Sequence, residues 1–183
     1  MAKFFDAIND SHREFIEKQH VFFVASAPLT ADGHVNLSPK GLDSLRVFSP
    51  HHVAYADMTG SGNETSAHLR ENGRITFMFC SFEGNPLILR LYGRGTTVLP
   101  GTPEWDELAP HFTLYPGVRQ IISAQIHSVQ TSCGFAVPKM DFVEDRHKLI
   151  EWSEAKGTDG LNAYREKNNL RSIDGLATAL CET

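Results

Sequence analysis

The chain has 183 residues, of which 41% are hydrophobic and 21% charged, and its formal net charge is −5. This composition is typical of a soluble globular protein, and the length predicts one domain whose core needs no disulfide or metal for stability. Because the basic residues are scattered and the net charge is negative, the sequence argues against nucleic acid as a partner.

The three cysteines, Cys80, Cys133 and Cys181, are odd in number and show no Cys-x-x-Cys spacing. This argues against a disulfide framework and against a thiolate zinc site. The histidines, including the pair His51-His52, also lack ligand spacing, so no metal site is expected. No run of about 18 apolar residues occurs and the N-terminus is interrupted by polar residues, so neither an export signal nor a membrane span is expected. We therefore expect a cytoplasmic protein.

The first segment shows apolar residues at helical spacing, which predicts a helical N-terminus. These residues are Phe4, Phe5, Ile8, Phe15 and Ile16. The pattern Ser11-x-x-Glu14 resembles a capping box, which would split the segment into two helices.

The middle of the chain contains apolar, β-branched and aromatic runs bounded by Gly, Pro, Asn and Asp, which predict six or seven strands. The runs are Val21–Ala27, Val35–Ser38, Leu45–Phe48, Val53–Ala56, Arg74–Phe82, Leu87–Leu99 and Gln120–Thr131. Only short helical patterns interrupt them, at Glu64–Glu71 and Pro103–Leu108. Because strands and helices do not alternate regularly, an antiparallel barrel is favoured over a doubly wound sheet.

After Asp141 the pattern predicts two helices with a break at Gly157–Gly160, and we expect this tail to cover the barrel. The expected organisation is a barrel with its N-terminal helix over residues 1–140 and a helical extension over 141–183, within a single domain overall.

The segment Asp57–Thr65 joins a predicted strand to a predicted helix through two glycines and several hydroxyl or amide residues. Such a turn can direct backbone N–H groups and hydroxyls at an anion, helped by the helix dipole. A plain helix start, with Ser61 or Asn63 as N-cap, explains the same residues about equally well. A dinucleotide-binding loop is disfavoured because Thr65 stands at the third glycine position and no further βαβ units follow.

Two basic residues stand out. Lys40 follows an alternating strand and could meet a phosphate or an electron-rich ring, although a solvated lysine at a strand end is the common case. Arg90 shares a strand face with Ile88 and Tyr92 by period-two alternation. It must therefore either reach the rim of the barrel or find a partner, which would be an internal carboxylate such as Asp57 or Glu64, a bound phosphate or a contact from a neighbouring subunit.

Several of these motifs occur in the order typical of the pyridoxamine 5′-phosphate oxidase-like family of FMN-binding split barrels, which the chain resembles over about residues 15–135. The motifs are Val35–Gly41, Val53–Asp57, Thr59–Thr65, Ala67–Asn72, Arg74–Phe79 and Ile88–Gly93.

The resemblance implies a mainly β fold, a six-stranded antiparallel split barrel with flanking N- and C-terminal helices. It also implies a homodimer with one FMN in each of two clefts between the subunits. The implied FMN-binding residues are Asn36, Leu37, Ser38, Pro39, Lys40, Asp57, Met58, Thr59, Ser61, Gly62, Asn63, Thr65 and Arg90. Ser132–Gly134 could lie against the flavin of the other subunit.

The chain departs from pyridoxamine phosphate oxidases at two places. Asn63, Glu64 and Thr65 stand where those enzymes hold the phosphate with basic residues, and the C-terminus lacks their arginine-rich segment. Vitamin B6 oxidation is therefore not expected. The resemblance predicts an FMN-dependent oxidoreductase of unknown substrate and unknown catalytic residues, or alternatively a non-catalytic flavin-binding module for storage, sensing or electron relay.

Overall fold

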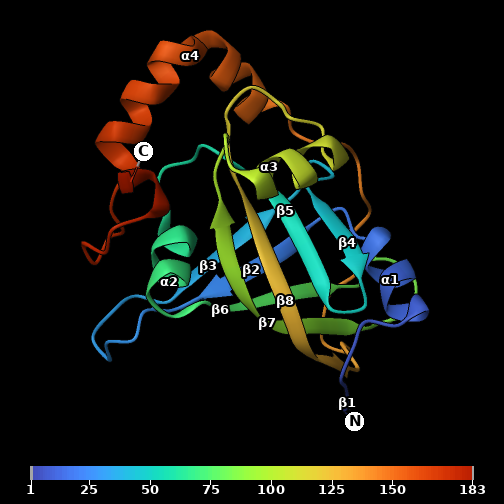
Figure 1. Ribbon diagram of the computed structural model, residues 1–183. Helices are drawn as coiled ribbons and strands as arrows, with labels where there is room; N and C mark the ends of the chain where they lie inside the picture. Colours follow the sequence, from blue (N-terminus) through green and yellow to red (C-terminus); the bar gives the residue numbers. More distant parts are fainter. Residues whose placement is uncertain (1, 183) are drawn as a thin grey trace.

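A computed structural model describes residues 2–182, and within these residues the chain forms one eight-stranded sheet flanked by helices (Figure 1). The strands are β1 (Lys3–Phe5), β2 (Phe22–Ser26), β3 (Asn36–Lys40), β4 (Leu45–Ser49), β5 (His52–Met58), β6 (Arg74–Cys80), β7 (Ile88–Val98) and β8 (Val118–Ser132). The helices are α1 (Asp10–Glu17), α2 (Glu64–Asn72), α3 (Pro103–Leu108) and α4 (Lys148–Asn168), with 3₁₀ turns η1 (Ala109–His111) and η2 (Ala179–Glu182).

The strands pair antiparallel in the order β3-β2-β6-β7-β8-β5-β4, and β1 adds to β8. The two edge strands, β3 and β4, are consecutive in the chain and are joined by the short loop Gly41–Ser44. The sheet therefore curls, which brings its two edges close together. This is the mainly β, antiparallel split-barrel class that the resemblance implies, but the described residues form eight strands rather than the six expected. The predicted strands agree with β2 to β8 within two residues at each end, and β1 is additional.

The core lies inside the curled sheet, where alternate residues of four neighbouring strands form a buried row. Its members, each fully buried and paired with the next across the sheet, are Val24, Phe77, Leu91 and Val129. The residues between them face outward, because successive side chains of a strand point to opposite faces. One outer row runs from Phe23 through Met78 and Arg90 to Gln130, and all four are half-buried. The sheet therefore has an inner face that packs and an outer face that stays partly open.

The predicted helical N-terminus is wrong for its first residues. Phe4 and Phe5 lie in β1, which pairs with the end of β8, because the long β8 offers backbone partners that the sequence pattern does not reveal. The helix begins only after Asn9, whose side chain accepts the backbone N–H of His12 at 2.9 Å. The capping box consists of Asn9 and His12 rather than Ser11 and Glu14.

The C-terminal helix contains the predicted break. Gly157 has φ 63° and ψ 178°, so α4 consists of two helical pieces joined at a residue whose backbone conformation favours glycine. In Figure 1, α4 arches over the end of the sheet near α3, and the chain then descends beside α2, which η2 contacts. None of the helices within residues 2–182 is long and apolar enough to cross a membrane.

Candidate functional site

A cavity of about 640 Å³ opens where β3, the end of β5, the turn into α2 and the chain after α4 meet. All of the residues predicted to hold FMN contribute to its wall except Leu37, Thr59 and Arg90. Those that line it are Asn36, Ser38, Pro39, Lys40, Asp57, Met58, Ser61, Gly62, Asn63 and Thr65. Three segments that are separate in the sequence therefore converge on one cavity.

A buried carboxylate, Asp57, lies at the floor of this cavity and binds three donors. Its Oδ1 accepts from Lys40 Nζ at 2.8 Å, and its Oδ2 accepts from Arg119 Nε and Gln120 Nε2, each at 2.9 Å. Burial by itself would raise the pKa of the Asp57 carboxyl, but the charges of Lys40 and Arg119 and the hydrogen bonds that they donate outweigh it. They hold the pKa of Asp57 well below its usual range, so the carboxylate is charged at neutral pH.

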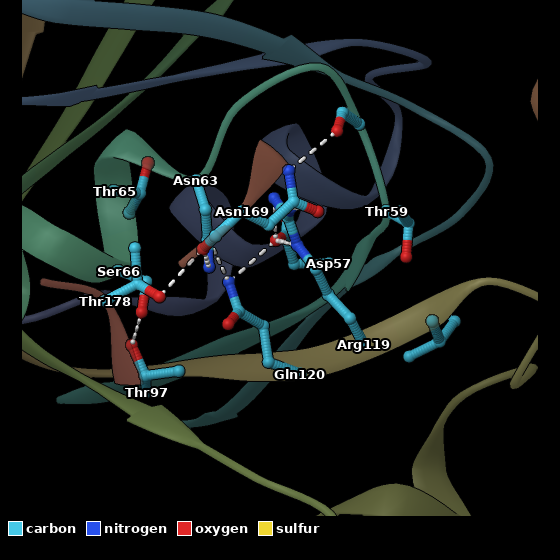
Figure 2. Close-up of polar contacts among 12 residues, drawn as sticks. Asp57, Thr59, Asn63, Thr65, Ser66, Thr97, Arg119, Gln120, Asn169 and Thr178 are labelled. Atoms are coloured by element: carbon cyan, nitrogen blue, oxygen red, sulfur yellow. Dashed lines mark hydrogen bonds and ion pairs between the residues drawn. The ribbon is translucent and has the colours of Figure 1, made fainter. Parts of the chain in front are cut away.

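The same network continues into the turn before α2, as Figure 2 shows. Gln120 Nε2 also donates to Asn63 Oδ1 at 2.8 Å, and Asn63 Nδ2 donates to the carbonyl of Asn169 at 3.3 Å. Asn169 Oδ1 accepts from Arg119 at 2.8 Å. Asp57, Asn63, Arg119, Gln120 and Asn169 are all buried, so these bonds form away from water and hold the turn to the sheet.

The start of α2 is not a plain capped helix. Asn63 occupies the N-cap position, but its side chain makes no capping hydrogen bond because it binds Gln120 and Asn169 instead. The first-turn N–H groups of α2 therefore lack a side-chain cap from this residue, next to a cavity wall that includes Ser61 and Gly62. An interpretation in which Asn63 serves only as a cap is wrong.

Two further side chains of this turn contact other elements. Thr65 Oγ1 accepts from Asn36 Nδ2 at 3.1 Å, which links α2 to β3. The Glu64 carboxylate accepts the backbone N–H of Ile173, at 3.0 and 3.2 Å to its two oxygens. Glu64 is thus engaged by the chain after α4 rather than left free in the cavity.

The remaining predicted site residues do not line the cavity. Leu37 is 62% exposed on the outer face of the sheet, and Arg90 lies on the same face, where it donates to Ser132 Oγ at 3.3 Å. Arg90 therefore pairs with neither Asp57 nor Glu64. Thr59 is fully buried; its hydroxyl donates to the carbonyl of Gly117 at 2.8 Å and accepts from Arg165 Nε at 2.8 Å.

Sequence analysis missed four residues of this site: Arg119, Gln120, Arg165 and Asn169. Arg119 and Gln120 are consecutive polar residues that directly precede the apolar pair Ile121-Ile122 in β8, which is the one local signal that could have marked them. Arg165 and Asn169 follow no motif, and only the folded chain brings them to the turn before α2.

Charged side chains of both signs surround the turn. Lys40, Arg119 and Arg165 approach it; Asp57 binds the first two, and Glu64 in the first turn of α2 brings a second negative charge to the cavity wall. Burial, and then the neighbouring charge of Arg119, lower the pKa of Arg165. Lys40 and Arg119 share one carboxylate and both line the cavity, so they would attract an anion there, because unlike charges attract strongly where water is scarce.

Comparison with known proteins identifies the family. The sequence model described as "Pyridoxamine 5'-phosphate oxidase" matches residues 8–133. The chain belongs to the pyridoxamine 5′-phosphate oxidase family. Among curated proteins of this family, it is 40% identical to the pyridoxamine 5′-phosphate oxidase family protein ustO of Aspergillus flavus, over 96% of this chain and 77% of that protein.

Solved structures support the fold. The H111A variant of HupZ from Group A Streptococcus has a TM-score of 0.54 at 21% identity, covering 68% of this chain and 99% of the other. A candidate pyridoxamine 5′-phosphate oxidase from Lactobacillus delbrueckii has a TM-score of 0.52 at 16% identity, covering 68% of this chain and 94% of the other. At these identities the likeness shows a shared fold, that of the pyridoxamine 5′-phosphate oxidase family.

Proposed function

We propose that this protein binds FMN in the 640 Å³ cavity and acts as an FMN-dependent oxidoreductase. One observation carries the proposal. Motifs that suggested a flavin site from the sequence, on β3, at the end of β5 and at the start of α2, converge on one cavity in a member of this family.

The residues present suit such a cofactor. The cavity falls within the range of about 300–1,000 Å³ that small-molecule sites occupy. Hydroxyls of Ser61 and Thr65, the start of α2 and the charges of Lys40 and Arg119 would hold the phosphate of FMN. Bound FMN would supply the electron transfer, while the chain binds it, orients it and excludes water.

We further propose that the functional unit is a homodimer in which the outer face of the sheet meets a second copy. Leu37, Arg90 and Ser132 lie on this face, outside their own chain's cavity, although the family motifs predict the first two at the flavin. Half-buried Phe23 and Met78 lie beside them and would supply apolar contact area. Two copies would let these residues reach a partner's cavity.

Purification and titration test the cofactor claim. We expect yellow protein with oxidised-flavin absorption, or uptake of added FMN by colourless protein. Lys40→Ala and Thr65→Ala should each weaken FMN binding by about 1–3 kcal/mol, because each removes a proposed donor. The exposed residues Lys139 and Thr158 provide the matched controls Lys139→Ala and Thr158→Ala, which should bind normally.

Protein that neither contains nor takes up FMN would refute the proposal. The oxidoreductase claim needs a second measurement, in which reduced flavin on the protein is mixed with quinones, small carbonyls and oxygen. Turnover with one acceptor supports an enzyme, whereas no turnover with any acceptor would leave a flavin-binding module.

A further inference from the structure

The wall of the cavity includes a stretch of chain beyond the residues that match the family model. We call residues 165–178 the C-terminal segment; the family match ends at residue 133. Asn168, Arg171, Ser172 and Ile173 of this segment line the cavity. Ile173 is 71% exposed, so burial of its side chain does not explain why the segment lies there.

Every polar group of Asn169 is hydrogen-bonded, and three of the bonds, to Arg119, Gly60 and Asn63, connect this segment to the site. Its Oδ1 accepts from Arg119 at 2.8 Å and its Nδ2 donates to the carbonyl of Gly60 at 3.1 Å. Its own carbonyl accepts from Asn63 and from Thr178, and its N–H donates to the carbonyl of Arg165. The residue is fully buried, so no water replaces these bonds.

These contacts form a continuous path to the cavity floor. Asn169 holds Arg119, Arg119 holds Asp57, and Asp57 holds Lys40 (Figure 2 shows the path as far as Asp57). A second path runs directly to the turn before α2, through Gly60 and Asn63. One asparagine therefore orients both the positive groups and the backbone turn that face the cavity.

Other contacts of the segment reinforce the same turn. Arg165 donates to Thr59 Oγ1, and Glu64 accepts the N–H of Ile173. Apart from apolar packing of α4, the segment thus meets the turn through directional polar bonds, which specify geometry more tightly than nonspecific apolar cover would.

We propose that the C-terminal segment is part of the cofactor site, with Asn169 as the positioning residue that holds the turn Gly60–Asn63 and Arg119 in binding geometry. Docking of the segment and binding of FMN then stabilise each other, because coupling between two binding events is reciprocal. The inference rests on the proposed function, since it concerns how the same cavity is kept ready for FMN.

The decisive variant is Asn169→Ala in the full chain, with Asn85→Ala, an exposed asparagine in the β6–β7 connection, as matched control. We expect Asn169→Ala to weaken FMN affinity by about tenfold or more, since it leaves buried groups unpaired. In the cofactor-free protein, amide hydrogen exchange of Gly60–Asn63 should accelerate while exchange in β6 to β8 stays unchanged. Asn85→Ala should change neither quantity.

Amide exchange also measures the coupling between FMN binding and docking of the C-terminal segment. Saturating FMN should slow amide exchange at 169–178 in the wild type, and this protection should shrink in Asn169→Ala in proportion to the lost affinity. Asn169→Asp keeps an acceptor for Arg119 and loses the donor to Gly60. Its affinity for FMN should therefore fall between those of the wild type and Asn169→Ala. It also serves as the test if Asn169→Ala unfolds.

The outcomes separate the two claims. Suppose that the wild type binds FMN. If Asn169→Ala then binds FMN equally well, or if FMN leaves amide exchange at 169–178 of the wild type unchanged, the inference is overturned and the proposed function stands. For Asn169→Asp, wild-type affinity would overturn the role given to the Gly60 contact. Wild type that binds no FMN would overturn the proposed function and the coupling together.

Discussion

At the scale of single residues, the site is organised around a buried negative charge. Asp57 partly compensates Lys40 and Arg119, which otherwise would bring two positive charges into a region with little water. Gln120 adds a third hydrogen bond to the same carboxylate, so Asp57 is fully engaged before any ligand binds. Its part in the site is to hold other groups, and a role as proton acceptor does not fit its lowered pKa.

Asp57→Asn should lower the free energy of unfolding by about 3–5 kcal/mol, because it removes one partner of a buried ion pair and leaves both cations uncompensated. Urea denaturation of the cofactor-free protein measures this. The matched control is Asp43→Asn, which removes an exposed pair with Arg46 and should cost about 0–1 kcal/mol. If the two variants lowered the free energy of unfolding equally, the central role of Asp57 would be contradicted.

The pH dependence follows from the same pKa. Because the folded-state pKa of Asp57 is lowered, its contribution to stability is complete above the unfolded-state pKa of about 4 and is lost as the pH falls toward the folded-state value. The stability difference between wild type and Asp57→Asn should therefore be constant near neutral pH and shrink below about pH 4.

At the scale of elements, the loop between β2 and β3 is fastened to the C-terminal segment. His34 donates its backbone N–H to Asp174 at 2.8 Å, and its Nδ1 lies 2.6 Å from the other oxygen of that carboxylate. The hydrogen bond and charge of Asp174, and to a lesser extent the charge of Glu64, raise the pKa of His34. The pKa of Asp174 is lowered in return. The pair therefore fastens two elements that are 140 residues apart.

The His34 pKa can be tested directly. The ionic part of this contact is complete below the unfolded-state pKa of His34, about 6.5, and is lost as the pH rises through the raised folded-state pKa. In Asp174→Asn, the pKa of His34 measured by NMR titration should fall toward about 6.5. Asp32→Asn, an exposed carboxylate in the same loop, should leave it unchanged. An unchanged pKa in Asp174→Asn would show that the contact does not form in solution.

At the scale of the whole molecule, the sheet has one face that is closed by the core and one that is partly open. Residues of the open face belong to strands at both sides of the sheet centre, so a partner seated there would contact β3, β2, β6, β7 and β8 together. In the proposed dimer a second copy of the chain packs on this face. Each of the two cavities would then be completed only when the two copies associate.

Leu37→Asp tests that assignment, because a carboxylate on an exposed position leaves the fold intact but is costly inside an interface. We expect the mass from sedimentation to change from dimer to monomer at micromolar protein, with weaker FMN binding in parallel. Val143→Asp is the control, since Val143 is 88% exposed and belongs to the irregular chain after β8 rather than to a strand of the sheet. Identical sedimentation of Leu37→Asp and wild type would place the dimer contact elsewhere.

Features that depend on near neighbours along the chain could be predicted from the sequence. Apolar, β-branched and aromatic runs bounded by turn residues predicted β2 to β8, and period-two alternation put Arg90 with Ile88 and Tyr92. The turn chemistry of Asp57–Thr65 predicted the strand, turn and helix that form there. These patterns can be recognised in the sequence because the spacing of side chains along a strand or helix is a local property of the backbone.

Which residues that are distant in the sequence contact one another depends on the tertiary structure. Phe4 and Phe5 became a strand because β8 lies beside them, and Arg90 faces outward because the curl of the sheet makes its inner face the core. The contact between Asn169 and Gly60 joins residues 109 positions apart, and that between Arg119 and Asp57 joins residues 62 apart. Such contacts depend on the whole chain being packed at once, and no local pattern of residues encodes them.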